Sequence, residues 1–266
     1  MNKIFAIDMD GTCLNDKNLI SEKCLTALAE LSKERIVVPT TGRSLSCLPH
    51  QLVDQDFYRY VISSNGAVLS DLKENKKLYQ ALLANQDVIS LLEEVSELKI
   101  GVSIHADDEF ILQGKVLGLM GRISYGEDVK RTINVKDLSA YLKEKAVDVE
   151  EVQLFFFSEK TKHRLQEVLK WHPNIEAAFS ENYVELYSHD ASKGNALKAL
   201  AEMLEVKKQD IACIGDSEND LSMFKVAEDS FAMGNAINQL KKEAKYIVAT
   251  NLEDGVYEAI TNYLMK

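Results

Sequence analysis

Short, uninterrupted runs of apolar residues recur in the first part of the chain. Ile4 to Ile7, Ile36 to Val38 and Val61 to Ile62 each end in a polar or glycine-containing turn. Uninterrupted rather than alternating apolar residues are typical of strands that are buried on both faces of a parallel sheet. Between the first two runs, leucines recur at helical spacing from Ser21 to Arg35, and Ser21 is a suitable N-cap. Strand, helix and strand in this order predict a βαβ unit.

The last part of the chain repeats this pattern. Segments with helical periodicity alternate there with short apolar runs. We expect helices at Lys193 to Val206, Glu218 to Ala227 and Gly255 to Tyr263, and strands at Ile211 to Ile214, Ser230 to Met233 and Tyr246 to Val248. The two ends of the chain together predict an α/β domain with a Rossmann-like parallel sheet.

The middle of the chain has a different pattern. Apolar and polar residues alternate from Ile100 to His105 and, less cleanly, from Val152 to Phe157. This period of two predicts an antiparallel sheet with one exposed face. Helices at Gln86 to Leu98 and Lys160 to Trp171 are expected to cover the other face, and the aromatic residues at the ends of these segments are expected in the core.

The change of pattern sets the predicted domain limits. Residues 83–187 are predicted to form an α+β module, inserted into a core domain that comprises 1–82 and 188–266. A chain of 266 residues that is 46% hydrophobic is long and apolar enough for one large domain or two modest ones.

Charge and cysteine usage narrow the class of protein. A net charge of −11 argues against nucleic acid or a membrane surface as a partner, because such binders need a basic face. It leaves a small anionic substrate open, since a few local cations can reverse the potential inside a cleft. Cys13, Cys24, Cys47 and Cys213 have no metal-binding spacing and are typical of reduced thiols. With no targeting segment recognised, we expect a cytoplasmic protein.

Two acids close the first apolar run. Asp8 and Asp10 stand two residues apart in Asp8-Met9-Asp10-Gly11-Thr12, and Gly11 allows a sharp turn after them. Two carboxylates this close repel each other unless a cation or a proton intervenes. Oxygen ligands of this kind suit Mg²⁺. The simpler interpretation, a solvated Asp-Gly turn, explains two of these positions but not the whole pattern.

A second acidic segment follows another predicted strand. Gly215 to Asp220 reads Gly-Asp-Ser-Glu-Asn-Asp directly after Ile211 to Ile214. Acids in the first turn of a helix gain from its dipole, which could explain Glu218 and Asp220 alone. Asp216 instead lies at the carboxyl end of a strand, where ligands bind in open α/β sheets. It would complete a metal site if it faced Asp8 from a neighbouring strand.

Three further segments are candidates for binding an anion. Lys193 opens a predicted helix, where a cation opposes the helix dipole unless an anion lies there. Thr41 and Gly42 follow a strand and offer a hydroxyl and a backbone N–H to phosphate oxygens. A solvated lysine and a polar turn are equally simple interpretations of these residues. Asn65-Gly66 is first of all a turn signal.

These segments together resemble a known family. Residues 8 to 12 (DMDGT), Thr41, Lys193 and residues 215 to 220 (GDSEND) are similar to the four ordered motifs of the haloacid dehalogenase (HAD) superfamily. SSNGA at 63 to 67, MGNA at 233 to 236 and DGV at 254 to 256 resemble its Cof-type sugar-phosphatase subfamily. The resemblance implies a HAD core with an inserted α+β cap that selects the substrate.

The resemblance also implies the roles of the acids. Asp8 would attack phosphorus and form an aspartyl-phosphate. Asp10 would act as general acid and then general base, and would offer Mg²⁺ its backbone carbonyl. Asp8 and Asp216 would ligate Mg²⁺, and Asp220 would steady the site. Thr41 and Lys193 would hold the non-bridging phosphate oxygens.

Asn219 and the Gly11 amide are expected to help bind the phosphate. The predicted activity is thus Mg²⁺-dependent hydrolysis of a small phosphorylated metabolite, such as a sugar phosphate. A phosphomutase or phosphotransferase on the same core is a second hypothesis, and a non-catalytic metabolite-binding regulator is a third. His105, Lys115, Arg122 and Arg131 are the candidates in the cap for selecting the substrate; the sequence does not predict an oligomeric state.

Overall fold

The computed structural model describes residues 3–53, 55–114 and 132–265. The chain divides into two compact units. Unit 1 comprises Met1–Gly42, Pro49–Gln80 and Ser192–Lys266, and unit 2 comprises Arg43–Leu48 and Ala81–Ala191. The domain limits expected from the sequence stay predictions, and the short segment Arg43–Leu48, which they place in the core, groups with unit 2 in the structure.

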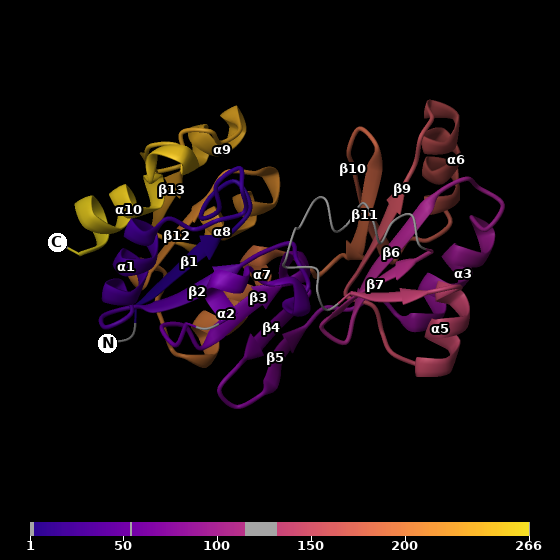
Figure 1. Ribbon diagram of the computed structural model, residues 1–266, viewed down its shortest axis with the longest axis horizontal. Helices are drawn as coiled ribbons and strands as arrows, with labels where there is room; N and C mark the ends of the chain where they lie inside the picture. Colours follow the sequence, from indigo (N-terminus) through magenta and orange to yellow (C-terminus); the bar gives the residue numbers. More distant parts are fainter. Residues whose placement is uncertain (1–2, 54, 115–131, 266) are drawn as a thin grey trace. The chain divides into compact units, whose positions relative to one another are not determined.

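Unit 1 is built on a mostly parallel sheet with strand order β14-β13-β12-β1-β2-β3-β4-β5 (Figure 1). The strands from β14 to β3 run parallel, and β4 and β5 add antiparallel strands at one edge. Their bounds are β1 Ile4–Asp8, β2 Ile36–Thr40, β3 Tyr60–Ser63, β4 Val68–Asp71, β5 Lys76–Gln80, β12 Ile211–Gly215, β13 Asp229–Ala232 and β14 Tyr246–Ile247. The sheet confirms the predicted α/β class.

Strand β1 lies inside this sheet, between β2 and β12. Its four apolar side chains, from Ile4 to Ile7, have no exposed area, which explains why the run is apolar without alternation. Because the three strands are parallel, Asp8, Thr40 and Gly215 all lie at the carboxyl edge of the sheet. The loops that follow them are therefore brought together at the edge where ligands bind in such sheets.

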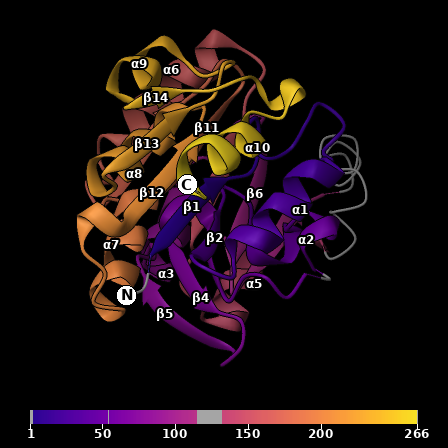
Figure 2. The same ribbon diagram turned by 90° about the vertical axis from the view of Figure 1, so that its left-hand side faces the viewer.

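Helices cover both faces of the sheet in unit 1. α1 and α10 lie on one face, and α7 and α8 on the other (Figure 2). The helices are α1 Glu22–Leu31, α2 His50–Val53, α7 Lys193–Met203, α8 Leu221–Val226, α9 Asn238–Glu243 and α10 Gly255–Ala259. The hydroxyl of Ser21 accepts the N–H of Cys24, as expected for an N-cap worth about 1 kcal/mol.

Unit 2 is an antiparallel sheet covered by helices on one face. Its strand order is β10-β11-β9-β6-β7-β8, with only the β7–β8 pair parallel. The elements are α3 Asn85–Glu94, β6 Gly101–Ala106, β7 Glu109–Gln113, β8 Ile133–Val135, α5 Leu138–Lys145, β9 Glu151–Phe155, α6 Glu159–Leu169, β10 Ile175–Phe179 and β11 Tyr183–Ser188. The predicted antiparallel sheet is confirmed, and the two alternating segments pair in it as β6 against β9.

The apolar positions of unit 2 form its core. Val102 and Ile104 of β6 and Leu154 of β9 pack with buried residues of the covering helices, such as Leu91 and Leu165. Figure 1 shows α3, α5 and α6 on one side of this sheet. Alternation places one set of side chains against the helices and the other set on the opposite face, as expected for a strand period of two.

Some expectations about the elements were wrong. α1 ends at Leu31 rather than Arg35, because Ser32 already caps it with backbone hydrogen bonds. α3 and α7 also end earlier than expected, at Glu94 rather than Leu98 and at Met203 rather than Val206. The sheet face of unit 2 expected to be exposed carries Ser103 and Glu151, both fully buried. The aromatic residues Phe157 and Trp171 are 74% and 82% exposed instead of lying in the core.

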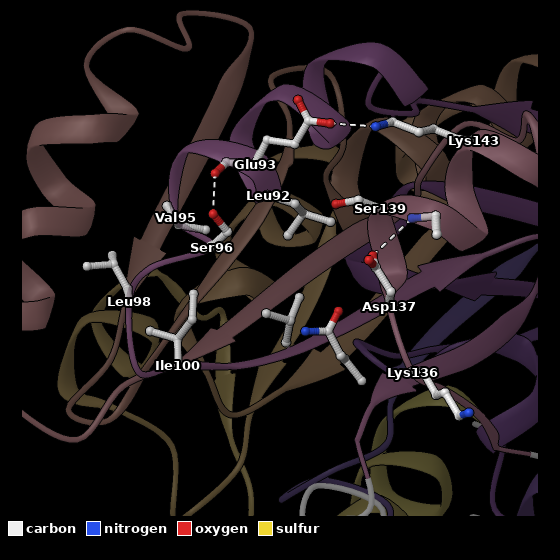
Figure 3. A pocket seen from close by; sticks show the side chains of 13 residues that line it. Leu92, Glu93, Val95, Ser96, Leu98, Ile100, Lys136, Asp137, Ser139 and Lys143 are labelled. Carbon is white, nitrogen blue, oxygen red and sulfur yellow. Dashed lines mark hydrogen bonds and ion pairs between the residues drawn. The ribbon is translucent and has the colours of Figure 1, made fainter.

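Among the described residues, no helix is both long and apolar enough to cross a membrane. A cavity of about 410 Å³ opens in unit 2 between α3 and α5 (Figure 3). Lys143 Nζ lies 2.5 Å from Glu93 Oε1 and joins the two helices beside this cavity. None of the predicted site residues that the structure describes lines it.

Candidate active site

The first acidic segment turns back sharply at the end of β1. Asp8 is the last residue of the strand, and the Met9 carbonyl accepts the N–H groups of Cys13 and Leu14 at 3.0 and 2.9 Å. Gly11 has φ +79°, which a side chain would disfavour. A Cβ there would also lie 2.6 Å from Asp216 Oδ2, so glycine allows this loop to pass close to the second acidic segment.

The second acidic segment is organised by Asp220. Its Oδ2 accepts the backbone N–H groups of Asp216 and Ser217 at 2.9 and 3.0 Å, and Ser217 and Asp220 form a reciprocal capping box. Asp216 is further held by Thr12, whose hydroxyl donates to Asp216 Oδ1 at 3.0 Å. The two loops at the ends of β1 and β12 are thus joined through their side chains.

Three carboxylates converge at this edge of the sheet. Asp8, Asp216 and Asp220 each offer one oxygen, and these oxygens lie within 4.8 Å of one another. Lys193, the first residue of α7, places Nζ 2.6 Å from Asp8 Oδ1 and 2.7 Å from Asp220 Oδ1. Lys193 is only 1% exposed, so the interpretation of this residue as a solvated lysine was wrong.

The cluster carries more negative charge than one lysine neutralises. Burial raises the pKa of the Asp8 carboxyl well above its usual value, Asp220 raises it further, and Lys193 opposes both without offsetting them. Burial and Asp220 likewise raise the pKa of Asp216, against a hydrogen bond from Thr12. Burial alone would lower the pKa of Lys193, but the carboxylates of Asp220 and Asp8 outweigh it and raise that pKa.

These residues fit a divalent cation. Asp8 Oδ2 is buried and has no hydrogen-bond partner among the described residues, although a buried carboxylate oxygen without a partner is costly. An all-oxygen set of carboxylates suits Mg²⁺, which takes one or two carboxylates together with water and phosphate oxygens. A cation beside Asp8 and Asp216 would satisfy Oδ2 and relieve the repulsion that raises both pKa values.

The other predicted site residues lie around this cluster in unit 1. Asp10 is exposed and is not part of the three-carboxylate group. Thr41 is buried directly after β2, and the following Gly42 packs its Cα against the amide of Asn65. Asn219 lies in the turn after β12, where its Nδ2 donates to Asn65 Oδ1 at 2.9 Å. The roles assigned to these residues stay predictions.

The sequence did not reveal three residues that join the loops. Thr12 belongs to the DMDGT motif but had been given no role, and it holds Asp216. Asn235 of the MGNA segment donates to the Gly11 carbonyl at 2.8 Å. Asn65 had been interpreted chiefly as a turn residue and contacts Gly42 and Asn219. Their partners are distant in the sequence, so only the membership of each residue in a motif, DMDGT for Thr12, MGNA for Asn235 and SSNGA for Asn65, was a usable signal.

Of the four cap candidates, only His105 is described by the structure. Lys115, Arg122 and Arg131 lie outside the described residues. His105 is on β6, 4% exposed, and its ring meets Phe110 edge-on with 5.2 Å between the ring centroids. Burial lowers its pKa to about 3, so the imidazole is neutral at pH 7.

His105 should make the stability of the protein pH-dependent. The unfolded chain takes up a proton at His105 below about pH 6.5, whereas the folded chain does so only near pH 3, so stability falls as the pH drops through this window. Between pH 7 and pH 5, His105 should lower the free energy of unfolding of the wild type by about 2 kcal/mol, and His105→Gln should lack this loss. Urea unfolding at both pH values measures the free energy of unfolding. The matched change at the exposed His163, His163→Gln, should leave the pH dependence as in the wild type; an unchanged dependence in His105→Gln would contradict the prediction.

Comparison with known proteins supports the class that the fold and site define. The family model for haloacid dehalogenase-like hydrolases matches residues 5–260, and the chain belongs to that family. The resemblance expected from the motifs is therefore confirmed.

Similar proteins agree over nearly their whole length. The chain is 30% identical to the phosphatase YwpJ of Bacillus subtilis (strain 168), over 98% of this chain and 100% of that protein. It is 29% identical to the 5-amino-6-(5-phospho-D-ribitylamino)uracil phosphatase YcsE of the same organism, over 99% and 96%. A crystal structure of a haloacid dehalogenase-like hydrolase from Bacteroides thetaiotaomicron matches with a TM-score of 0.86 and 25% identity, over 98% and 99% of the two chains. The protein is thus a phosphatase of this family.

Proposed function

We propose that this phosphatase hydrolyses small phosphorylated metabolites through an aspartyl-phosphate on Asp8. The observation that carries the proposal is the state of the Asp8 carboxylate. Lys193 holds Oδ1 at 2.6 Å, while Oδ2 is buried and has no hydrogen-bond partner within the described part of the chain. A buried carboxylate held in one orientation at the ligand-binding edge of the sheet suits attack on phosphorus through one oxygen while the other oxygen binds the cation.

The reaction would proceed in two displacements. In the first, an Asp8 oxygen forms a bond to phosphorus while the bond to the ester oxygen breaks, and Asp10 donates a proton to the leaving alcohol. In the second, water attacks the phosphorus of the aspartyl-phosphate, Asp10 takes up the proton from that water, and the Asp8 carboxylate is regenerated with release of inorganic phosphate. The exposure of Asp10 supports this role, because its proton must reach both the leaving group and water.

Positive charge must accompany the phosphate. A phosphate dianion repels Asp8, so the Lys193 ammonium is needed to bind its oxygens, with Thr41, Gly42, Asn219 and the Gly11 amide as further donors. Asp8, Asp216 and the Asp10 carbonyl would hold Mg²⁺, with Asp220 supporting them. When bound, Mg²⁺ would supply electrostatic stabilisation of the phosphoryl group.

The substrate is proposed to be a sugar phosphate or a similar small metabolite. The name of the relative YcsE, a phosphatase of a phosphorylated ribitylamino compound, supports a phosphorylated polyol or sugar chain. The net charge of −11 supports a small ligand rather than nucleic acid or a membrane surface as the partner.

A substrate screen tests this proposal. Sugar phosphates, nucleotides, flavin-type phosphates and pyridoxal phosphate are incubated with the protein, with Mg²⁺ or with EDTA, and free phosphate is measured. We expect release from at least one of these esters, at least about 100-fold faster with Mg²⁺, because the cation supplies several kcal/mol of charge stabilisation. Hydrolysis of none of them would contradict the proposal, and isomerised hexose phosphate without stoichiometric phosphate would show a mutase instead.

A further inference from the structure

Three consecutive residues after β3 have left-handed backbone conformations. Ser64, Asn65 and Gly66 have φ values of 47°, 54° and 93°. For residues other than glycine this region is sterically unfavourable, and such strain persists only where surrounding contacts hold it. Strained residues of this kind gather at binding and catalytic sites. The contacts that hold this turn therefore indicate which residues it positions.

The side chain of Asn65 lies between the loops after β2 and β12. Its Oδ1 accepts Asn219 Nδ2 at 2.9 Å. A Cβ on Gly42 would lie 3.0 Å from Asn65 Oδ1 and 3.2 Å from its Nδ2, so the Gly42 backbone packs directly on the amide. The Asn65 N–H also donates to the Thr41 carbonyl at 3.1 Å. One residue thus touches three residues proposed to bind the phosphate.

Gly66, the next residue, packs against the backbone of another residue proposed to bind the phosphate, Lys193. A Cβ on Gly66 would overlap the carbonyl group of Ser192 and would lie 2.5 Å from the backbone nitrogen of Lys193. The turn Ser64–Gly66 therefore packs against the peptide that begins α7. Lys193 takes its position from that peptide, and its Nζ reaches Asp8 and Asp220 from there.

We propose that Asn65 is a positioning residue that fixes Asn219 and the Thr41–Gly42 backbone for binding of the phosphate oxygens. This inference rests on the proposed function, since the substrate phosphate is the ligand that these residues would bind. Asn65 acts through its neighbours, and the strained turn Ser64–Gly66 is kept because it brings Asn65 and Gly66 between the loops.

The chemistry of the two amides explains why residue 65 is an asparagine. Asn65 Oδ1 is an acceptor, so it holds the nitrogen end of the Asn219 amide and fixes which way that amide points. A primary amide nitrogen carries a second N–H, and phosphate oxygens bind donors. Asparagine also tolerates the left-handed conformation better than most residues. Both requirements are met by the same side chain.

The test is the variant Asn65→Gly. Glycine accepts φ 54° without strain, so this change removes the amide while the turn is retained. We expect the dissociation constant of inorganic phosphate, measured by titration calorimetry with Mg²⁺ present, to rise about tenfold. This is the effect of losing one hydrogen bond to the phosphate, here the bond from Asn219 once Asn65 no longer orients its amide. KM for a hydrolysed ester should rise in parallel. The melting temperature should stay within a few degrees of the wild type.

A matched control separates positioning from strain. Asn75 lies in the exposed β4–β5 turn with φ 48°, so Asn75→Gly makes the same change in the same backbone conformation away from the site. It should leave phosphate binding and KM unchanged. A lower melting temperature in Asn65→Gly with unaltered phosphate affinity would show a structural role only and would overturn the proposal.

A double variant tests whether Asn65 acts through Asn219. If it does, Asn65→Gly combined with Asn219→Ala should bind phosphate no more weakly than the weaker of the two single variants. Full additivity of the two effects would count against the inference. If the wild type binds phosphate but hydrolyses no ester, the proposed function is contradicted, and the comparison of phosphate affinities still decides the role of Asn65. If the wild type binds no phosphate, the proposed function and the role of Asn65 are both contradicted.

Discussion

Replacing Asp8 with asparagine is expected to lower Mg²⁺-dependent phosphate release by at least about four orders of magnitude, the size of effect seen when a nucleophile is removed. The amide keeps the shape of the side chain but cannot form the aspartyl-phosphate. The fold should tolerate the change, because burial and Asp220 already disfavour the charged form of Asp8. Free phosphate is measured under saturating substrate, together with the melting temperature.

The matched control is Asp16→Asn, which makes the same change at an exposed acid in the segment that follows the β1 loop. Its turnover should equal that of the wild type. Mg²⁺-dependent turnover that persists in Asp8→Asn would eliminate Asp8 as the nucleophile. Phosphoryl transfer from the substrate should leave on the wild-type protein a phosphate adduct that is stable in acid and labile in base. The Asp8→Asn variant should form no such adduct.

The second large effect is expected in stability, for Gly66→Ala. Alanine at φ 93° is strained, and its Cβ would overlap the Ser192 carbonyl group, which is backbone and cannot move aside as a side chain could. We expect a loss of more than about 3 kcal/mol in the free energy of unfolding of unit 1, from strain of about 1–2 kcal/mol together with the overlap. Urea unfolding measures it.

Gly114 provides the comparison. It has a similar φ of 84°, but a Cβ there would meet no atom of the described residues within 4 Å. Gly114→Ala should therefore cost only the strain, about 1–2 kcal/mol. Equal losses in the two variants would mean that the contact of Gly66 with the start of α7 contributes nothing, and that backbone strain alone explains why position 66 is glycine.

The sequence predicted the central part of unit 1 well, for a physical reason. β1 and β12 are buried on both faces, so their runs are apolar throughout, and each is followed at once by acids that have no place in a core. Asp8 and Asp216 could therefore be placed at one sheet edge from the sequence, whereas Asp220 was assigned to the site only through the resemblance. Parallel pairing of β1 with β12 then brings them within reach of one cation.

The edge of the same sheet was not predicted. β4 and β5 form an antiparallel addition, and β5 is short, partly exposed and rich in lysine, so it lacks the apolar signal of a buried strand. The buried polar face of unit 2 was missed for a related reason. Alternation shows that Ser103 and Glu151 share a face, but not what covers that face.

The role of Asn65 could not be predicted from local pattern either. An Asn-Gly pair is a turn signal in most contexts, and the sequence gives no indication that the amide of Asn65 meets Asn219. That contact exists only because β3 and β12 end at the same edge of the sheet. Motifs therefore indicated which residues bear the chemistry, whereas the residues that hold them in place became visible only in three dimensions.

Because β12 pairs with β1, the carboxylate group can assemble only after both ends of the chain have been synthesised. Thr12 and Asp216 are 204 residues apart in the chain, yet their side chains are hydrogen-bonded. During synthesis the segment with Asp8 therefore emerges long before Lys193 and Asp216. Until then β1 lacks one of its two neighbouring strands. A ribosome-bound fragment that ends before β12 contains Asp8 but lacks Asp216 and Asp220, the other two members of the carboxylate group.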